Sequence, residues 1–179
     1  DGIPNYVGNL YVALYPMGDF KDLIDWLKKN PGKANFASQD SGFNASLFKS
    51  VTGTTFEIIN YASGGETAAS VVKGETDIAS QNFSSSGPGL STGKTRALAF
   101  TGAKRLANLP NVPTTKEAGL PDYQVSAWNA VFAPKNTPKD VVAKLNDALS
   151  KALDDEATRK RLLDLGGVLP EKAERSGEW

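Results

Sequence analysis

Apolar and polar positions alternate along the first hundred residues in a way that predicts strands and helices in turn. An aromatic and β-branched run at residues 10–15 stops at Pro16 and predicts a β-strand. Asp19 follows as the cap of a helix that ends before Asn30. The apolar residues of this helix recur at helical spacing and are Phe20, Leu23, Ile24 and Leu27.

The same alternation continues through four further short strands. They are predicted at residues 34–37, 56–61, 76–79 and 96–101. Helices are predicted from about Phe43 and over residues 67–72, whereas residues 84–93 are so rich in Ser, Gly and Pro that they predict a loop or one short helical turn. Strands that alternate with helices are typical of an α/β fold with a mostly parallel sheet.

The pattern changes after Gly102. Residues 104–119 predict an ordered surface connection with one short helical signal at 114–118. A strand is predicted at 125–133, an amphipathic helix at 138–153 and a last helix at 156–165. The charged segment after Pro170 shows no usable periodicity.

A polar turn, Ser38 to Gly42, joins the predicted strand at 34–37 to the helix that begins near Phe43. In open α/β sheets, ligands bind beyond the carboxyl ends of the strands. The start of a helix offers unpaired N–H groups and the positive end of the helix dipole, so this stretch predicts a site for a small anion. The alternative is an ordinary connection in which Asp40 or Ser41 merely caps the helix.

A second polar turn, Ala62 to Glu66, follows the strand at 56–61. Its Gly64-Gly65 pair permits the backbone to approach a ligand closely, although a pair of glycines after a strand is also common in ordinary turns. We expect the two turns to lie side by side at the carboxyl ends of their strands.

Composition excludes several classes of function. The sequence has no His and no Cys, which removes the usual nucleophile pairs, the usual zinc sites and histidine acid/base chemistry. Lys plus Arg equals Asp plus Glu at 20 each, so nucleic acid is not an expected partner. No run is long and apolar enough to span a membrane. We predict no catalytic residues, no cofactor and no metal site.

Many motifs in fixed order closely resemble the substrate-binding proteins of tripartite tricarboxylate transporters, the TctC or Bug family. The matching motifs are Asn30-Pro31-Gly32-Lys33, Phe36-Ala37-Ser38, Tyr61 with Gly64-Gly65-Glu66, Gly74, Asp77, Gly93-Lys94, Arg96-Ala97-Leu98-Ala99, Lys104-Arg105, Leu109-Pro110, Val112-Pro113-Thr114, Glu117-Ala118-Gly119, Pro121, Tyr123, Trp128, Ala133-Pro134 and Thr137-Pro138. The resemblance covers nearly the whole chain.

The resemblance implies a type II periplasmic-binding-protein-like α/β fold. Residues 1–122 would form one complete five-stranded lobe, the second lobe of the family, and residues 123–179 the return strand and C-terminal helices of the first lobe. The family's N-terminal segment, which builds most of that first lobe, is absent from this sequence, and no signal peptide precedes Asp1. We therefore expect the C-terminal segment to fold back on the remaining lobe, to self-associate with another copy, or to belong to a longer protein.

The function implied by the resemblance is that of a periplasmic, extracytoplasmic receptor. It would capture a small carboxylate between two lobes and deliver it to membrane transporter subunits. The alternatives are a ligand-presenting sensor component for a signalling partner and a small α/β enzyme, which the missing His and Cys disfavour. The expected ligand-binding residues are Ser38, Gln39, Ser41, Gly42, Phe43, Asn44, Tyr61, Ser63, Gly64, Gly65 and Thr67.

The first turn departs from the family pattern. The family tends toward a Gly-rich, Ser-containing turn and a His within the helix, where this sequence has Asp40, Phe43 and Ser46. A carboxylate at Asp40 would repel a carboxylate ligand unless Asp40 points away or caps its own helix.

Overall fold

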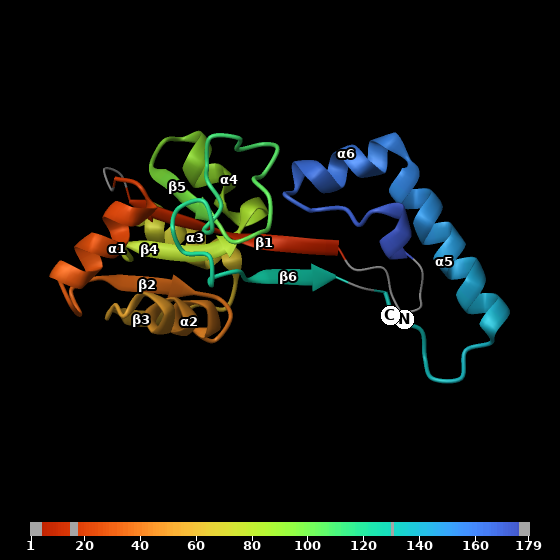
Figure 1. The fold of residues 1–179 in the computed structure, drawn as a ribbon, viewed down its shortest axis with the longest axis horizontal. Helices are drawn as coiled ribbons and strands as arrows, with labels where there is room; N and C mark the ends of the chain where they lie inside the picture. Colours follow the sequence, from red (N-terminus) through yellow and green to blue (C-terminus); the bar gives the residue numbers. More distant parts are fainter. Residues whose placement is uncertain (1–4, 15–17, 130, 176–179) are drawn as a thin grey trace. The chain divides into compact units, whose positions relative to one another are not determined.

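The structure is a computed structural model that describes residues 5–14, 18–129 and 131–175 (Figure 1). The chain divides into two compact units. The larger unit is Gly8–Ser126, and the smaller one combines the residues before Gly8 with those from Ala127 onward.

One sheet joins the five strands predicted in the first hundred residues. These strands are β1 (Asn5–Leu14), β2 (Asn35–Ser38), β3 (Glu57–Asn60), β4 (Ile78–Asn82) and β5 (Thr95–Phe100). Their order is β3-β2-β4-β1-β5, and β6 (Ser126–Asn129) also pairs with β1. The pairs β2·β3 and β2·β4 are parallel, whereas β1 is antiparallel to both β4 and β5. The predicted α/β class is confirmed, with β1 as the strand that runs against the others.

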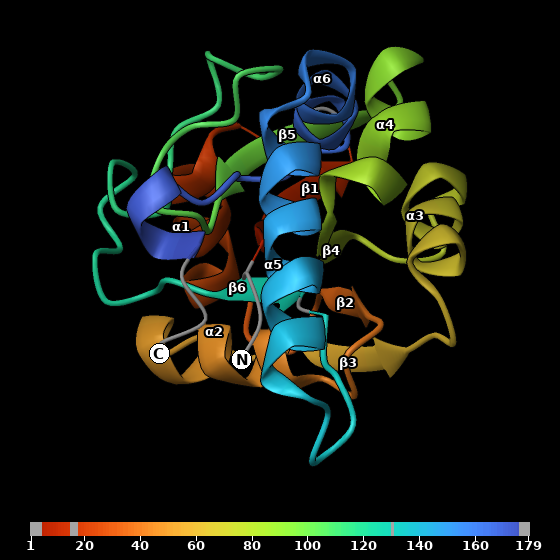
Figure 2. The ribbon, with the colours of Figure 1, turned by 90° about the vertical axis from the view of Figure 1, so that its right-hand side faces the viewer.

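Helices cover both faces of this sheet (Figure 2). On one face lie α1 (Phe20–Lys29) and α2 (Phe43–Thr52); on the other lie α3 (Gly64–Lys73) and α4 (Phe83–Ser91). The main core forms under α1 and α2 and contains five fully or almost fully buried aromatic residues, Phe20, Phe36, Phe48, Phe56 and Tyr123. Burial of each such side chain stabilises the fold by about 1.5–3 kcal/mol.

The start of α1 is fixed by the predicted cap. Asp19 accepts a hydrogen bond from the main-chain N–H of Asp22 at 2.9 Å, and Asp22 accepts one from the N–H of Asp19 at 2.8 Å. This reciprocal pair satisfies two of the N–H groups that a helix start leaves unpaired.

The prediction of a loop or one short helical turn for residues 84–93 is wrong, because most of this segment forms the helix α4. The sequence argument failed because tertiary packing outweighs the low helix propensity of Ser, Gly and Pro. Gly89 shows this packing: a Cβ there would lie 2.6 Å from Oγ1 of Thr95 and 3.0 Å from a methyl carbon of Val72. Only a residue without a side chain allows α4 to approach α3 and β5 this closely.

Other element boundaries differ by a few residues. The strand predicted at 76–79 is Ile78–Asn82, and the strand predicted at 125–133 is the shorter Ser126–Asn129, with Ala130 outside the described residues. The helical signal at 114–118 is a turn rather than a helix. Such shifts are the usual error of boundary prediction from sequence alone.

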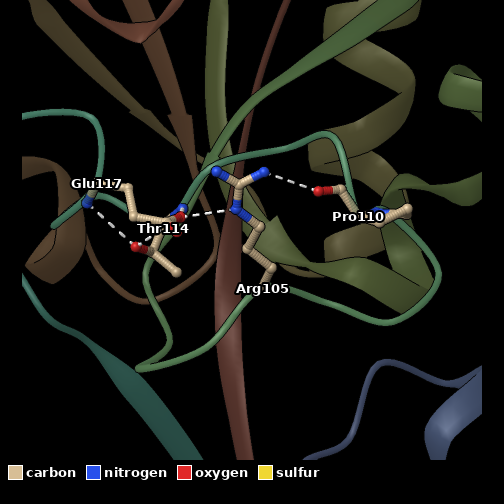
Figure 3. A network of polar contacts seen from close by, with 4 residues as sticks. All are labelled: Arg105, Pro110, Thr114 and Glu117. Atoms are coloured by element: carbon tan, nitrogen blue, oxygen red, sulfur yellow. Dashed lines mark hydrogen bonds and ion pairs between the residues drawn. The ribbon is translucent and has the colours of Figure 1, made fainter.

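The connection after β5 is held by a network around Glu117 (Figure 3). Glu117 Oε2 accepts hydrogen bonds from Arg105 Nε at 2.9 Å and from the N–H of Thr114 at 2.7 Å. Arg105 also donates to the main-chain oxygen of Pro110 at 2.9 Å. The N–H of Thr114 and the Arg105 guanidinium together hold the pKa of Glu117 below its ordinary value.

The smaller unit contains α5 (Lys139–Asp154), α6 (Glu156–Asp164) and a 3-10 helix, η1 (Lys172–Arg175). The two predicted helices are confirmed, with Pro138 as the N-cap of α5. Neither α5 nor α6 contains a buried residue. The segment after Pro170 is tied to α5, because the buried Arg175 side chain donates to Asp154 Oδ1 at 2.8 Å.

Candidate ligand-binding site

Three helices begin directly beyond the parallel strands of the larger unit. β2, β3 and β4 run in the same direction, and α2, α3 and α4 follow them after zero to four residues. The starts of these helices therefore gather at the carboxyl edge of the sheet, where the sequence predicts a ligand site.

The first turn is closed by its own side chains. The buried Ser38 hydroxyl donates to Asp40 Oδ1 at 2.5 Å and accepts from the N–H of Gly42 at 3.0 Å. Asp40 Oδ2 accepts from the N–H of Asn44 at 3.1 Å. Asp40 therefore caps its own helix, one of the two arrangements that the sequence left open, and Ser41 is not the capping residue.

Glycine is required at the end of this turn. Gly42 is the N-cap of α2 and has φ of 82°, and the preceding Ser41 also has a positive φ of 57°. A side chain at Gly42 would also approach Ile58 of β3 to 3.3 Å. The left-handed backbone conformation and this close approach both favour glycine here.

The second predicted turn is shorter than expected, because α3 begins at Gly64 and not near Thr67. Ser63 is the N-cap, and its hydroxyl accepts from the N–H of Glu66 at 3.3 Å. Gly64 and Gly65 thus form the first turn of the helix. Within the described part of the chain, their N–H groups donate to no protein acceptor. Thr67 is buried, and its hydroxyl donates back to the Ser63 main-chain oxygen at 3.0 Å.

The two turns lie side by side, as predicted. Ser38 pairs with Asn60 in the parallel ladder, and the N–H of Tyr61 donates to the Ser38 main-chain oxygen at 2.8 Å. A Cβ at Gly64 would lie 2.4 Å from Gln39 Oε1 and 2.5 Å from Ser85 Oγ. The start of α3 is therefore flanked by a side chain from the first turn and by one from the first turn of α4.

The remaining predicted site residues differ in their exposure. Phe43 is 65% exposed, Gln39 and Tyr61 are half-buried, and Asn44 is only 7% exposed. Among the described residues, Asn44 Oδ1 is a buried acceptor that receives no hydrogen bond, and the hydroxyl of Ser80 on β4 is likewise unpartnered. Ser80 follows Ile78 and Ala79, which pair with Phe36 and Ala37, so the register places it beside Ser38.

Sequence reasoning missed Ser80 and Ser85 as residues of this edge. Ser85 falls within residues 84–93, for which the sequence predicts a loop or one short helical turn, and Ser80 comes just after the strand predicted at 76–79. The signal that could have found Ser80 is the polar run Ser80-Gln81-Asn82 at the end of an apolar strand, the same pattern that marks Ser38, whereas Ser85 has no such signal.

The charge of this edge is negative. Across residues 38–44, 60–67 and 80–86 the only charged side chains are Asp40 and Glu66. An anion bound at this edge would therefore be held by N–H groups and hydroxyls of these segments.

Comparison with known proteins identifies the family. The TctC model, described as the tripartite tricarboxylate transporter family receptor, matches residues 6–174. The chain belongs to this family. As predicted, TctC is a receptor family and not an enzyme family. In the described residues, no helix has the length and apolar character needed to cross a membrane.

The chain is also similar to a protein of known sequence. A UPF0065 protein of Agrobacterium vitis, from the TAR-I ttuE-ttuC' intergenic region, is 32% identical over 153 residues, which are 83% of this chain and 44% of that protein. The chain thus spans about half the length of this relative.

Solved structures share the fold over most of this chain. MatC from Rhodopseudomonas palustris with bound malate is 30% identical to this chain and has a TM-score of 0.82. The match covers 98% of this chain and 63% of the MatC chain. Rpa4515 from R. palustris with adipate is 28% identical with a TM-score of 0.84, over 94% of this chain and 60% of its own. A periplasmic transporter is 34% identical with a TM-score of 0.84, over 95% of this chain and 60% of its own.

Proposed function

We propose that this chain is part of a periplasmic receptor that captures a small carboxylate and delivers it to membrane transporter subunits. The observation that carries the proposal is the start of α3, where the N–H groups of Gly64 and Gly65 have no acceptor among the described residues and lie beside Gln39 and Ser85. Family membership and the carboxylates bound to MatC and Rpa4515 support the same ligand class.

The physical basis is the anion preference of a helix start. Two unpaired N–H groups lie at the start of α3, which is the positive end of its dipole. Each hydrogen bond from such a group to a charged acceptor contributes about 1.5–3 kcal/mol. Gly64 and Gly65 have no side chain that would keep a carboxylate from the backbone. These features support a ligand carboxylate bound at the start of α3, close to Ser63, Gln39 and Ser85.

The architecture proposed for the whole protein follows the type II binding proteins. The larger unit, Gly8–Ser126, would form one lobe and the smaller unit would belong to the other lobe, in place of the boundary at 122–123 that the resemblance implies. The absence of buried residues in α5 and α6, with Val141 and Leu145 of α5 exposed, supports this assignment. Self-association through these helices is the competing arrangement, and light scattering on the isolated 179-residue chain distinguishes the two.

The test of the proposed function is calorimetry on the full natural protein with a panel of small mono- and dicarboxylates. Gly64→Ala places a methyl group at the start of α3 and is expected to weaken binding of the best ligand at least tenfold. Gly87→Ala on α4 is the matched control, because a Cβ at Gly87 meets no atom within 4 Å. Unchanged affinity in Gly64→Ala, or no binding of any carboxylate by the wild type, contradicts the proposal.

A further inference from the structure

An open cavity of about 370 Å³ lies between α3 and α4, which pack side by side on one face of the sheet (Figure 2). Each helix contributes one face to its walls, since the lining residues recur at positions i, i+3, i+4 and i+7. They are Gly65, Ala68, Ala69 and Val72 of α3, and Ser85, Pro88 and Gly89 of α4 with its C-cap Thr92. The cavity therefore lies within the larger unit.

Small residues keep this cavity open. Gly65, Ala68 and Ala69 carry at most a methyl group, and a Cβ at Gly65 would meet only the Ser63 hydroxyl oxygen within 4 Å, at 3.8 Å. Pockets for small organic ligands usually have volumes of about 300–1,000 Å³. The cavity thus has the size of a site for a small molecule.

The cavity reaches the start of α3, where the proposed carboxylate binds. Gly65 belongs to both features, because it lines the cavity and its N–H has no acceptor among the described residues. Ser85 also lines the cavity, and its Oγ lies 2.5 Å from the position that a Cβ at Gly64 would take. A ligand held by the N–H groups of Gly64 and Gly65 therefore has the cavity directly beside it.

The chemistry of the walls favours an apolar chain on an anion. Ala68, Ala69, Val72 and Pro88 present hydrocarbon surface and no side-chain donor or acceptor. Lys94, which is exposed, is the only charged residue that lines the cavity, and its positive charge suits a negatively charged ligand. Donors at the helix start and hydrocarbon beyond it match a molecule with an anionic head and an apolar body.

The length of the cavity sets the length of this body. From Gly65 to Val72 the helix α3 advances by seven residues, which is about 10 Å at a rise of about 1.5 Å per residue. An extended, unbranched chain of about eight carbons has a similar length, because each carbon–carbon bond is about 1.5 Å long.

Resting on the proposed function, we infer that the cavity between α3 and α4 holds the apolar chain of the ligand whose carboxylate lies at the start of α3. The ligand class is an unbranched, medium-chain monocarboxylate, and Ala68 and Ala69 are specificity-determining residues because they leave room for its chain. Complete burial of one methylene group raises an affinity about fourfold. In a cavity open to solvent, a gain of about twofold per methylene is expected.

The experiment measures affinity against chain length. Calorimetry on the full natural protein compares butyrate, hexanoate, octanoate and decanoate, which share the carboxylate and differ only in their methylene groups. The affinity is expected to rise about fourfold from butyrate to hexanoate and again to octanoate. It is expected to rise less from octanoate to decanoate, because the longer chain extends beyond the cavity.

Substitutions that fill the cavity test where the chain lies. Ala69→Leu places a larger side chain in the wall and is expected to lower the affinity for octanoate at least tenfold, with the affinity for butyrate changed less than threefold. Ala68→Leu is expected to act in the same direction. Ala103→Leu makes the same change at an exposed position outside the cavity and should leave the whole series unchanged. Thermal unfolding verifies that each variant folds.

The outcomes separate this inference from the proposed function. Wild-type protein that binds carboxylates with an affinity independent of chain length overturns the inference and leaves carboxylate binding intact. A rise with chain length that persists in both Ala69→Leu and Ala68→Leu places the chain elsewhere and overturns the inference as well. Failure of the wild type to bind any carboxylate overturns both.

Discussion

The hydroxyl of Tyr123 donates to the main-chain oxygen of Asn44 across 3.1 Å and so joins residues that are 79 positions apart. Both residues are buried, and the Tyr123 ring packs edge-on against Phe48 of α2 with ring centroids 5.8 Å apart. The chain segment after the Glu117 network thus supports the first turn of α2, where the candidate site begins.

Removal of this hydroxyl tests the link. Tyr123→Phe keeps the ring and is expected to lower the free energy of unfolding by about 1 kcal/mol, the usual net value of a buried hydrogen bond. Urea denaturation measures the change. Tyr61→Phe is the matched control, since Tyr61 is half-buried and no hydrogen bond of its hydroxyl is found among the described residues. Equal effects of the two substitutions would show that the bond to Asn44 contributes nothing specific.

The two serines of the first turn are expected to differ in their effect on stability. The Ser38 hydroxyl is buried between Asp40 Oδ1 and the N–H of Gly42, so Ser38→Ala removes the hydrogen bond that each of these two atoms makes to it and is expected to cost about 1–3 kcal/mol. Ser41 is exposed, and Ser41→Ala should change the stability by less than about 0.5 kcal/mol. Chemical denaturation measures the free energy of unfolding of the two variants. A Ser38→Ala variant as stable as the wild type would show that Asp40 does not need this partner.

The Glu117 network predicts a dependence of stability on pH. The folded-state pKa of Glu117 is lowered from 4.5, first by the N–H of Thr114 and then by Arg105. A carboxyl whose pKa is lower when folded contributes stability that is fully present well above pH 4.5 and is lost as the pH falls through the folded-state pKa. Wild-type protein should therefore lose more stability than Glu117→Gln between pH 6 and acidic pH.

The measurement for Glu117 is the unfolding midpoint across this pH range. Glu57→Gln, at an exposed carboxylate of β3, serves as the control and should follow the wild-type curve. Parallel curves for wild type and Glu117→Gln would contradict the role assigned to the network.

The anchor of the last described segment can be tested within the smaller unit. Arg175 is 5% exposed and donates to Asp154 Oδ1, so Asp154→Asn leaves a buried guanidinium without its charge partner. Hydrogen exchange over residues 170–175 is expected to become at least several-fold faster. Asp147→Asn breaks only an exposed i,i+4 pair with Lys151, worth about 0.3–0.5 kcal/mol, and should leave that exchange unchanged. Equal exchange rates in the two variants would remove Asp154 as the anchor.

The sequence predicted the strand and helix alternation because its signals are local. The run at residues 10–15, the cap at Asp19 and the apolar positions of α1 each need only a short window to be recognised. The helix α4 could not be found in this way, because it depends on the fit of Gly89 against Thr95 of β5 and Val72 of α3, and packing against other elements is not visible in a local window.

Only part of the candidate site could likewise be predicted from local sequence. The two polar turns, their position after parallel strands and the self-capping role open to Asp40 could be stated from sequence. The choice between capping and a free carboxylate depends on side-chain geometry at Ser38 and Asn44, which no spacing rule determines. The same holds for Ser85, since its approach to Gly64 exists only once α3 and α4 are packed.

The order of strands in the sheet has a consequence for folding. β1 comes first along the chain, yet its antiparallel partners are β4 and β5, for example Leu10 with Gln81 and with Phe100. During synthesis, β1 therefore lacks both of these partners until the residues up to 100 have also been made. Such late, long-range pairing slows folding and leaves an aromatic, β-branched strand open to pairing between chains.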